Sequence, residues 1–237
     1  IMQNDVSLRL AKRIWEVVEK EFESGELFEK VSPITKELLR FWFCEPFISQ
    51  RQFNFHKGQK QSILNIIYLH EVLKINNVLE IYEQVAPDLL LESDLFGAKE
   101  TRNSLKESRY DLPKYLVKMA TGTGKTWVMH ALLIWQILNA KNEEEKSGRF
   151  TKNFLIVAPG LIVYDRLLDA YKGRLSENGD GRDFSTNDFV RNKDLFVPEN
   201  YREEVFSFIQ NNTVSKEEGI GSKITGNGLI AITNWHL

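Results

Sequence analysis

The fold class of this chain is decided by the stretch Met119-Ala120-Thr121-Gly122-Thr123-Gly124-Lys125-Thr126. A short apolar run, residues 115–117, precedes it, and apolar residues at helical spacing follow it over residues 127–138. This order predicts a strand, a glycine-rich turn and a helix. Glycines allow backbone N–H groups to turn toward an anion, and the start of a helix adds the positive end of its dipole. The stretch therefore predicts a phosphate-binding loop.

Each part of this loop has an expected role if the bound anion is a nucleotide. Lys125 is expected to reach the β- and γ-phosphates, and the Thr126 hydroxyl is expected to coordinate Mg²⁺. The rest of the cradle consists of the loop residues Ala120, Thr121, Gly122, Thr123 and Gly124. Met119 departs from the general pattern, which has a glycine at this position. The alternative is a chance glycine-rich turn, and the intact Gly-Lys-Thr ending argues against it.

The form Met-Ala-Thr-Gly-Thr-Gly-Lys-Thr resembles motif I of superfamily 2 helicases and translocases. Within them it is most similar to the motor subunits of type I and type III restriction enzymes and their DEAD/DEAH-like relatives. The resemblance covers about residues 51–237. It implies an ATP-dependent motor acting on duplex DNA in the cytoplasm, with ATP and Mg²⁺ as cofactors. A type III motor subunit also implies a separate nuclease domain and a methyltransferase partner, while type I motors and other phage-defence helicases remain open.

An aromatic and basic segment, residues 51–59, lies upstream of the loop and ends in Gln59. In superfamily 2 enzymes a Gln at the corresponding place reads adenine, since an amide can donate and accept at once. Phe53 or Phe55 could pack on the adenine ring. The alternative for Gln59 is an ordinary capping or solvent-facing side chain. Lys125 lies 66 positions after Gln59, a larger separation than a compact motor usually has.

Two apolar runs after the loop predict further parallel strands. Residues 153–158 lead into Pro159 and Gly160, which resembles motif Ia, and the run is apolar enough for a strand buried on both faces. We expect Pro159, Gly160 and Arg166 to contact nucleic-acid phosphates. A simple strand-to-helix turn is the alternative.

The last run, residues 229–233, ends in polar residues and resembles an element that follows motif Ia in restriction-type motors. Thr233 and Asn234 are the expected phosphate contacts. Trp235 could stack on a base, but core packing is the favoured interpretation. Between the two runs, the sequence predicts an extended segment at 194–198 and a helix at about 199–211.

The composition of the chain limits the kinds of partner and cellular compartment that we expect. The 237 residues carry a net charge of −2, so no global basic field indicates nucleic acid, and a nucleic-acid site must be a local patch. The single cysteine, Cys44, allows no intrachain disulfide and suits a reducing cytoplasm. No apolar run is long enough to span a membrane.

Together these features predict an α/β fold with a helical N-terminal region, residues 1–50. In that region we expect the aromatic run at 41–43 to be buried, and apolar residues recur at helical spacing at Leu10, Ile14, Val17 and Val18. A partial RecA-like ATP-binding domain follows at residues 51–237, with parallel strands at 114–118, 153–158 and 229–233. No apolar strand ends in the Asp-Glu pair that orients the attacking water in such motors. We therefore expect an inactive fragment of a longer ATP hydrolase. A nucleotide-binding or interaction module without turnover and a P-loop kinase remain as alternatives.

Overall fold

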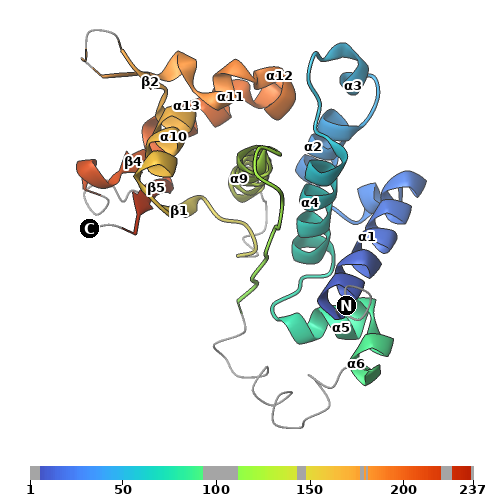
Figure 1. Cartoon of the computed structure of the whole chain (residues 1–237). Helices are drawn as coiled ribbons and strands as arrows, with labels where there is room; N and C mark the ends of the chain where they lie inside the picture. Colours follow the sequence, from blue (N-terminus) through green and yellow to red (C-terminus); the bar gives the residue numbers. More distant parts are fainter. Residues whose placement is uncertain are drawn as a thin grey trace. The chain divides into compact units, whose positions relative to one another are not determined.

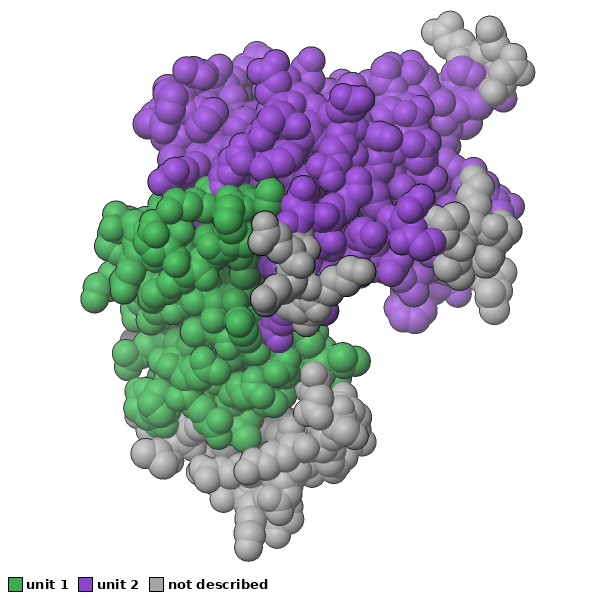
Figure 2. Space-filling view, turned by 180° about the vertical axis from the view of Figure 1, so that it is seen from behind, with its two compact units in different colours: residues 1–36, 56–128 green, residues 37–55, 129–237 purple. Residues whose placement is uncertain are grey.

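The computed structural model describes residues 6–92, 112–142, 148–176, 179, 181–219 and 226–235. The chain divides into two compact units: residues 1–36 with 56–128, and residues 37–55 with 129–237 (Figure 2). The predicted division into residues 1–50 and 51–237 stays a prediction. Within the described ranges, no helix combines the length and apolarity needed to cross a bilayer.

Helices build the first unit (Figure 1). In α1 (Val6–Ser24), the predicted apolar positions Leu10, Ile14 and Val18 are buried, and this helix contacts α4 and α5. The other helices that lie in this unit or begin in it are η2 (Glu26–Glu29), α2 (Pro33–Phe43), α4 (Lys57–Ile67), the π-helix η3 (Tyr68–Val72), α5 (Val78–Val85), α6 (Pro87–Glu92) and α9 (Lys125–Asn142). The predicted helical N-terminal region is therefore confirmed.

The predicted strand at 114–118 is wrong for the described residues, because residues 113–120 form no β-ladder with any of them. Leu116, the central apolar residue of this run, is 92% exposed. Three consecutive apolar residues predict an extended backbone, but a strand also needs a neighbour that accepts its hydrogen bonds. The glycine-rich turn and the following helix do form, since α9 begins at Lys125.

The second unit contains a parallel sheet of three strands, in the order β1-β5-β4 (Figure 1). The strands are β1 (Asn153–Ala158), β5 (Leu229–Asn234) and β4 (Thr213–Ser215). Their register pairs Ala158 with Asn234 and Ser215 with Ile232, so the carboxyl ends of all three strands lie at one edge. The predicted α/β class is confirmed, with a partial RecA-like parallel sheet, although β4 was not predicted.

One face of β1 is more exposed than its sequence predicts. Leu155 and Val157 are 65% and 41% exposed. Phe154 and Ile156 lie on the opposite face, in register with the buried Ile230 and Ile232. The apolar run predicted a strand buried on both faces. Among the described residues, β1 is covered on one face only.

Helices connect the strands of this unit. α10 (Leu161–Lys172) follows β1 and contacts all three strands. The remaining elements are α3 (Phe47–Gln50), β2 (Arg174–Leu175), β3 (Arg182–Asp183), η5 (Phe184–Thr186), α11 (Asp188–Arg191), α12 (Lys193–Phe196), η6 (Glu199–Tyr201), α13 (Arg202–Asn212) and η7 (Lys216–Glu218). The helix predicted at 199–211 is present, whereas residues 194–196 are helical and not extended. Asn192 explains this turn, because its carbonyl accepts from Leu195 and Phe196.

An aromatic cluster forms the core where α2, α9 and α12 meet within this unit. The Trp42 indole donates to the Phe196 carbonyl over 3.0 Å, and the Phe55 ring packs against Trp42, Phe43 and Phe196. Trp42 and Phe196 have no exposed surface. The expected burial of the Phe-Trp-Phe run is confirmed.

Candidate functional site

The glycine-rich loop has the backbone shape that its sequence predicts. Gly122 and Gly124 adopt φ values of 80° and 72°, a region that L side chains rarely enter. The Ala120 carbonyl accepts from the Thr123 amide and, over 2.7 Å, from the Thr123 hydroxyl. Thr121 and Gly122 are exposed, so the crest of the loop is open. The loop runs directly into α9, whose first amide N–H groups have no intrahelical acceptor.

Lys125 is exposed and folds back over the loop. Its Nζ donates to the carbonyls of Met119 and Ala120, over 3.2 and 2.9 Å. Both acceptors are neutral, and no carboxylate among the described residues forms an ion pair with this lysine. Thr126 is half-buried in the first turn of α9. An anion can therefore replace two neutral carbonyls as the partner of the ammonium without breaking a salt bridge.

Gln59 is brought to the loop despite its distance in sequence. Its side chain is 3% exposed, its Oε1 accepts from the His56 amide, and its Nε2 donates to the Gly124 carbonyl over 3.2 Å. A Cβ on Gly124 would lie 2.3 Å from this Nε2. Gln59 therefore both caps the start of α4 and holds the glycine-rich loop at Gly124. The predicted adenine contact stays a prediction, and it requires the amide to exchange one of these partners.

Sequence reasoning missed His56, which is a second clamp on the loop. Its Nδ1 accepts from the amides of Gly58 and Gln59, over 3.1 and 3.3 Å, and its Nε2 lies 2.8 Å from the Thr123 carbonyl. Because Nδ1 accepts and the carbonyl can only accept, Nε2 must carry the hydrogen. His56 and Gln59 together form a capping box at the start of α4. The spacing His-x-x-Gln was the available signal.

The two phenylalanines proposed for the adenine face differ in setting. Phe53 is 60% exposed. Phe55 belongs to the aromatic cluster of the second unit, so its ring is a packing residue there.

The second group of predicted residues meets at the carboxyl edge of the sheet. Pro159 and Gly160 follow β1 directly, and Gly160 is the N-cap of α10, with no side chain capping that helix. Asn234 lies opposite Ala158 at the end of β5, with Thr233 beside it. Arg166 is exposed on the second turn of α10. Trp235 is 73% exposed, so core packing, the favoured interpretation, is wrong for the described structure.

Asn234 has an unusual hydrogen-bonding state. The residue is 7% exposed, its Oδ1 accepts from Lys216 Nζ over 3.1 Å, and its Nδ2 has no acceptor among the described residues. Lys216 was not predicted as a site residue, because it follows a strand that was not predicted.

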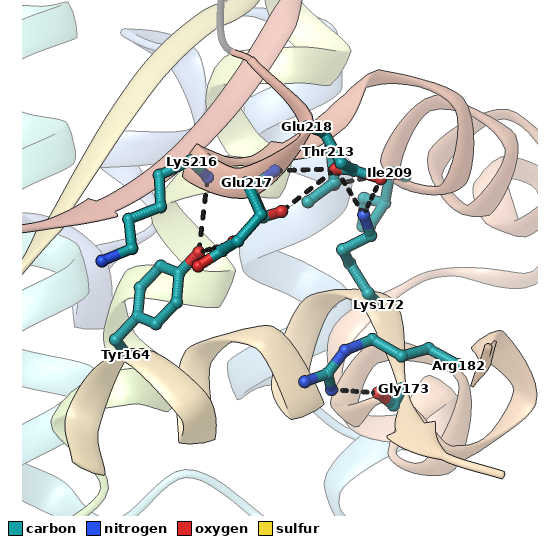
Figure 3. Close-up of polar contacts among 10 residues, drawn as sticks. Tyr164, Lys172, Gly173, Arg182, Ile209, Thr213, Lys216, Glu217 and Glu218 are labelled. Carbon is teal, nitrogen blue, oxygen red and sulfur yellow. Dashed lines mark hydrogen bonds and ion pairs between the residues drawn. The ribbon is translucent and has the colours of Figure 1, made fainter. Parts of the chain in front are cut away.

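Tyr164 makes hydrogen bonds at the same carboxyl edge of the sheet (Figure 3). The Tyr164 hydroxyl accepts from the Lys216 amide over 3.3 Å and donates a short bond to Glu217. Burial and the bond to Glu217 raise the pKa of Tyr164 to about 12. The hydroxyl therefore stays protonated as a donor over the physiological range.

His130, five residues beyond Lys125, is a packing residue. It is fully buried against the rings of Tyr171, Phe189 and Phe196, and neither ring nitrogen has a partner among the described residues. Burial lowers the pKa of this imidazole to about 3. The described part of the chain holds no cluster of three or more His, Cys, Asp or Glu side chains suited to a metal ion.

Comparison with known proteins shows the family to which the chain belongs. The family described as type III restriction enzyme, res subunit, matches residues 52–225, well over half of the 237 residues. Neither the curated proteins nor the solved structures contain a match. The matched range includes Gln59, the glycine-rich loop at 119–126, Gly160 and Arg166. The chain therefore belongs to the family of type III restriction enzyme res subunits, which are helicase-like, ATP-hydrolysing motors.

Proposed function

We propose that this chain carries the ATP-binding part of an ATP-dependent DNA translocase or helicase of the type III restriction kind. The observation that carries the proposal is the open loop at residues 119–126, whose lysine is exposed and, among the described residues, bound only to neutral carbonyls. A phosphate oxygen offers that ammonium a charged acceptor, and charge-assisted bonds are about twice as strong as neutral ones.

The proposed roles follow from the donors available. Lys125 binds the β- and γ-phosphates, and the loop amides of residues 120–124 cradle them. The Thr126 hydroxyl is a hard oxygen ligand of the kind that Mg²⁺ accepts beside substrate phosphates. Gln59 reads adenine after exchanging one of its present partners for the base. Catalysis in this class is positioning and charge stabilisation, which Lys125 and Thr126 supply.

Duplex DNA is the proposed second substrate, bound along the carboxyl edge of the parallel sheet. Ligands of open α/β sheets bind at this edge. Pro159, Gly160, Arg166, Thr233 and Asn234 are the proposed contacts. A nuclease domain and a methyltransferase partner belong to the proposal through the family alone. A reducing cytoplasm is the proposed location, supported by the single Cys44.

A second candidate is a nucleotide-binding module without turnover. It is favoured by one sequence observation, that no apolar strand here ends in an Asp-Glu pair. Without that glutamate, no residue orients the attacking water. A P-loop kinase is the third candidate and needs a substrate acid that the sequence does not reveal.

Measuring ATP hydrolysis with and without duplex DNA separates the three candidates. Hydrolysis that DNA stimulates supports the motor. Phosphate transfer to a small metabolite supports the kinase. ATP binding with no turnover in either condition supports the module and contradicts the activity proposed for this chain.

A further inference from the structure

Lys216 places a positive charge at the edge where the three parallel strands end. It is the first residue of η7 and follows Ser215, the last residue of β4. Since β4 runs parallel to β5, and β5 parallel to β1, Lys216 emerges at the same edge as Asn234 and Pro159. The hydrogen bond from Lys216 Nζ to Asn234 Oδ1 joins two of these strand ends directly.

The charge of Lys216 is not paired with a carboxylate in the part of the chain that the structure describes. Its Nζ donates to a neutral amide oxygen and lies 5.3 Å from the centre of the Tyr164 ring. Among the described residues, no carboxylate forms an ion pair with it. Nearby cations are different, because Lys172 pairs with Glu218 and Arg182 with Asp169, each over 2.6 Å. The roughly 480 Å³ hollow beside Lys172 and Arg182 therefore does not present free positive charge.

The backbone at Lys216 is held in place from both sides. The Tyr164 hydroxyl accepts from the Lys216 amide and donates to Glu217, while the Ser215 amide donates to Glu218 over 2.9 Å. Glu218 is in turn fixed by Lys172. Figure 3 shows the Lys216 side chain running beside Tyr164, with its ammonium directed away from the Lys172–Glu218 pair. A restrained cation loses less conformational entropy when it binds a ligand.

An independent observation at this edge points to a missing acceptor. Asn234 is 7% exposed, and its Nδ2 donor has no partner among the described residues. A buried donor without an acceptor is unfavourable, and a ligand oxygen or a water can offset that cost by accepting its hydrogen bond. Gly160, the N-cap of the 12-residue helix α10, which has no side-chain cap, lies two residues beyond the Ala158 that pairs with Asn234. Donors therefore gather around Lys216.

We propose that Lys216 is a phosphate-binding residue for the sugar–phosphate backbone of duplex DNA, positioned by Tyr164. This inference rests on the proposed function and adds a residue to its DNA-binding edge. The contact reads charge and not base sequence, because an ammonium on an open strand end offers no paired donor and acceptor for a base edge. Tyr164 is a positioning residue, since it reaches the ligand only through Lys216.

Glu217 limits the strength of this contact. Burial raises the pKa of its carboxyl, but hydrogen bonds from Tyr164, the Glu217 amide and Ser215, with a smaller effect of the Lys216 charge, leave that pKa lowered. A carboxylate close to an incoming phosphate opposes binding. Glu217→Gln keeps an acceptor for the Tyr164 hydroxyl and removes the charge, so duplex DNA should bind the Glu217→Gln chain more tightly.

The test measures binding of a fluorescent duplex DNA of mixed sequence to the full chain over a series of KCl concentrations. Each phosphate contact contributes about −0.9 to the slope of log K against log salt. Lys216→Met keeps the apolar stem over Tyr164 and should make the slope shallower by about 0.9. Lys216→Arg should retain the slope. Lys193→Met, which removes an exposed charge from α12, is the matched control and should bind as the unaltered chain does.

The outcomes distinguish a failure of the Lys216 contact from a failure of the proposed DNA-binding edge. A shallower slope for Lys216→Met alone, with circular dichroism unchanged, supports the inference. Equal slopes for the Lys216→Met chain and the unaltered chain overturn it and leave the proposed function standing. If the unaltered chain binds no duplex DNA at low salt, the proposed DNA-binding edge fails, and the inference fails with it.

Discussion

The Gln59 amide donates to the Gly124 carbonyl across 3.2 Å and so joins the first turn of α4 to the glycine-rich loop at residues 119–126. His56 makes the parallel contact to the Thr123 carbonyl. Two consecutive loop carbonyls are therefore held by one helix start. Both carbonyls therefore already have donors, and an anion at this loop would be bound by N–H groups.

Gln59→Ala should weaken ATP more than GTP if the amide exchanges Gly124 for adenine. A bidentate amide–adenine contact contributes about 1–3 kcal/mol of discrimination, and the substitution should therefore reduce the ATP-to-GTP affinity ratio at least about fivefold. Fluorescent ATP and GTP analogues measure both constants on the same preparation. Equal losses for both nucleotides would show that Gln59 only supports the loop.

Gly124→Ala should cost more stability than Gly122→Ala. Both positions have positive φ, so each substitution carries about 1–2 kcal/mol of backbone strain. At Gly124 the new methyl also meets Gln59 Nε2 at 2.3 Å, whereas at Gly122 no atom lies within 4 Å. Urea unfolding of the two variants gives the comparison. Equal losses in the free energy of unfolding would mean that the Gln59 amide is not held beside Gly124 in solution.

His130 should make the protein less stable as the pH falls. The unfolded imidazole binds a proton near pH 6.5, whereas the buried one binds it only near pH 3, so the unfolded state holds more protons between these values. The contribution is complete above pH 6.5, and about 2 kcal/mol is lost by pH 5. Urea unfolding from pH 8 to pH 5 measures it. His130→Phe should remove this part of the slope, and an unchanged slope would contradict the buried neutral state.

Local patterns predicted most of the individual elements. The loop at 119–126, the strand–helix pair β1 and α10, and the strand β5 each carry their signal within a few residues. The spacing of Leu10, Ile14 and Val18 likewise predicted α1. These elements can be predicted without knowing which segments they pack against, because apolar periodicity and glycine conformation are local properties of the sequence.

What the sequence did not predict depends on partners distant in the chain. The run at 115–117 has the local pattern of a strand, yet strand pairing requires a neighbour that no local pattern identifies. β4 has only three residues, too few for a periodic signal. His56, Lys216 and Tyr164 became recognisable only through contacts 52 to 67 residues away in sequence. Tertiary placement, and not residue type, gives these three side chains their proposed roles.

Binding of ATP with Mg²⁺, measured by isothermal titration calorimetry, tests the central claim most directly. Lys125→Ala should abolish detectable binding, because no other side chain in the loop carries a positive charge to the β- and γ-phosphates. Lys12→Ala, which removes an exposed charge from α1, should bind as tightly as the unaltered chain. If Lys125→Ala binds ATP with the affinity of the unaltered chain, the loop at residues 119–126 is not the nucleotide site.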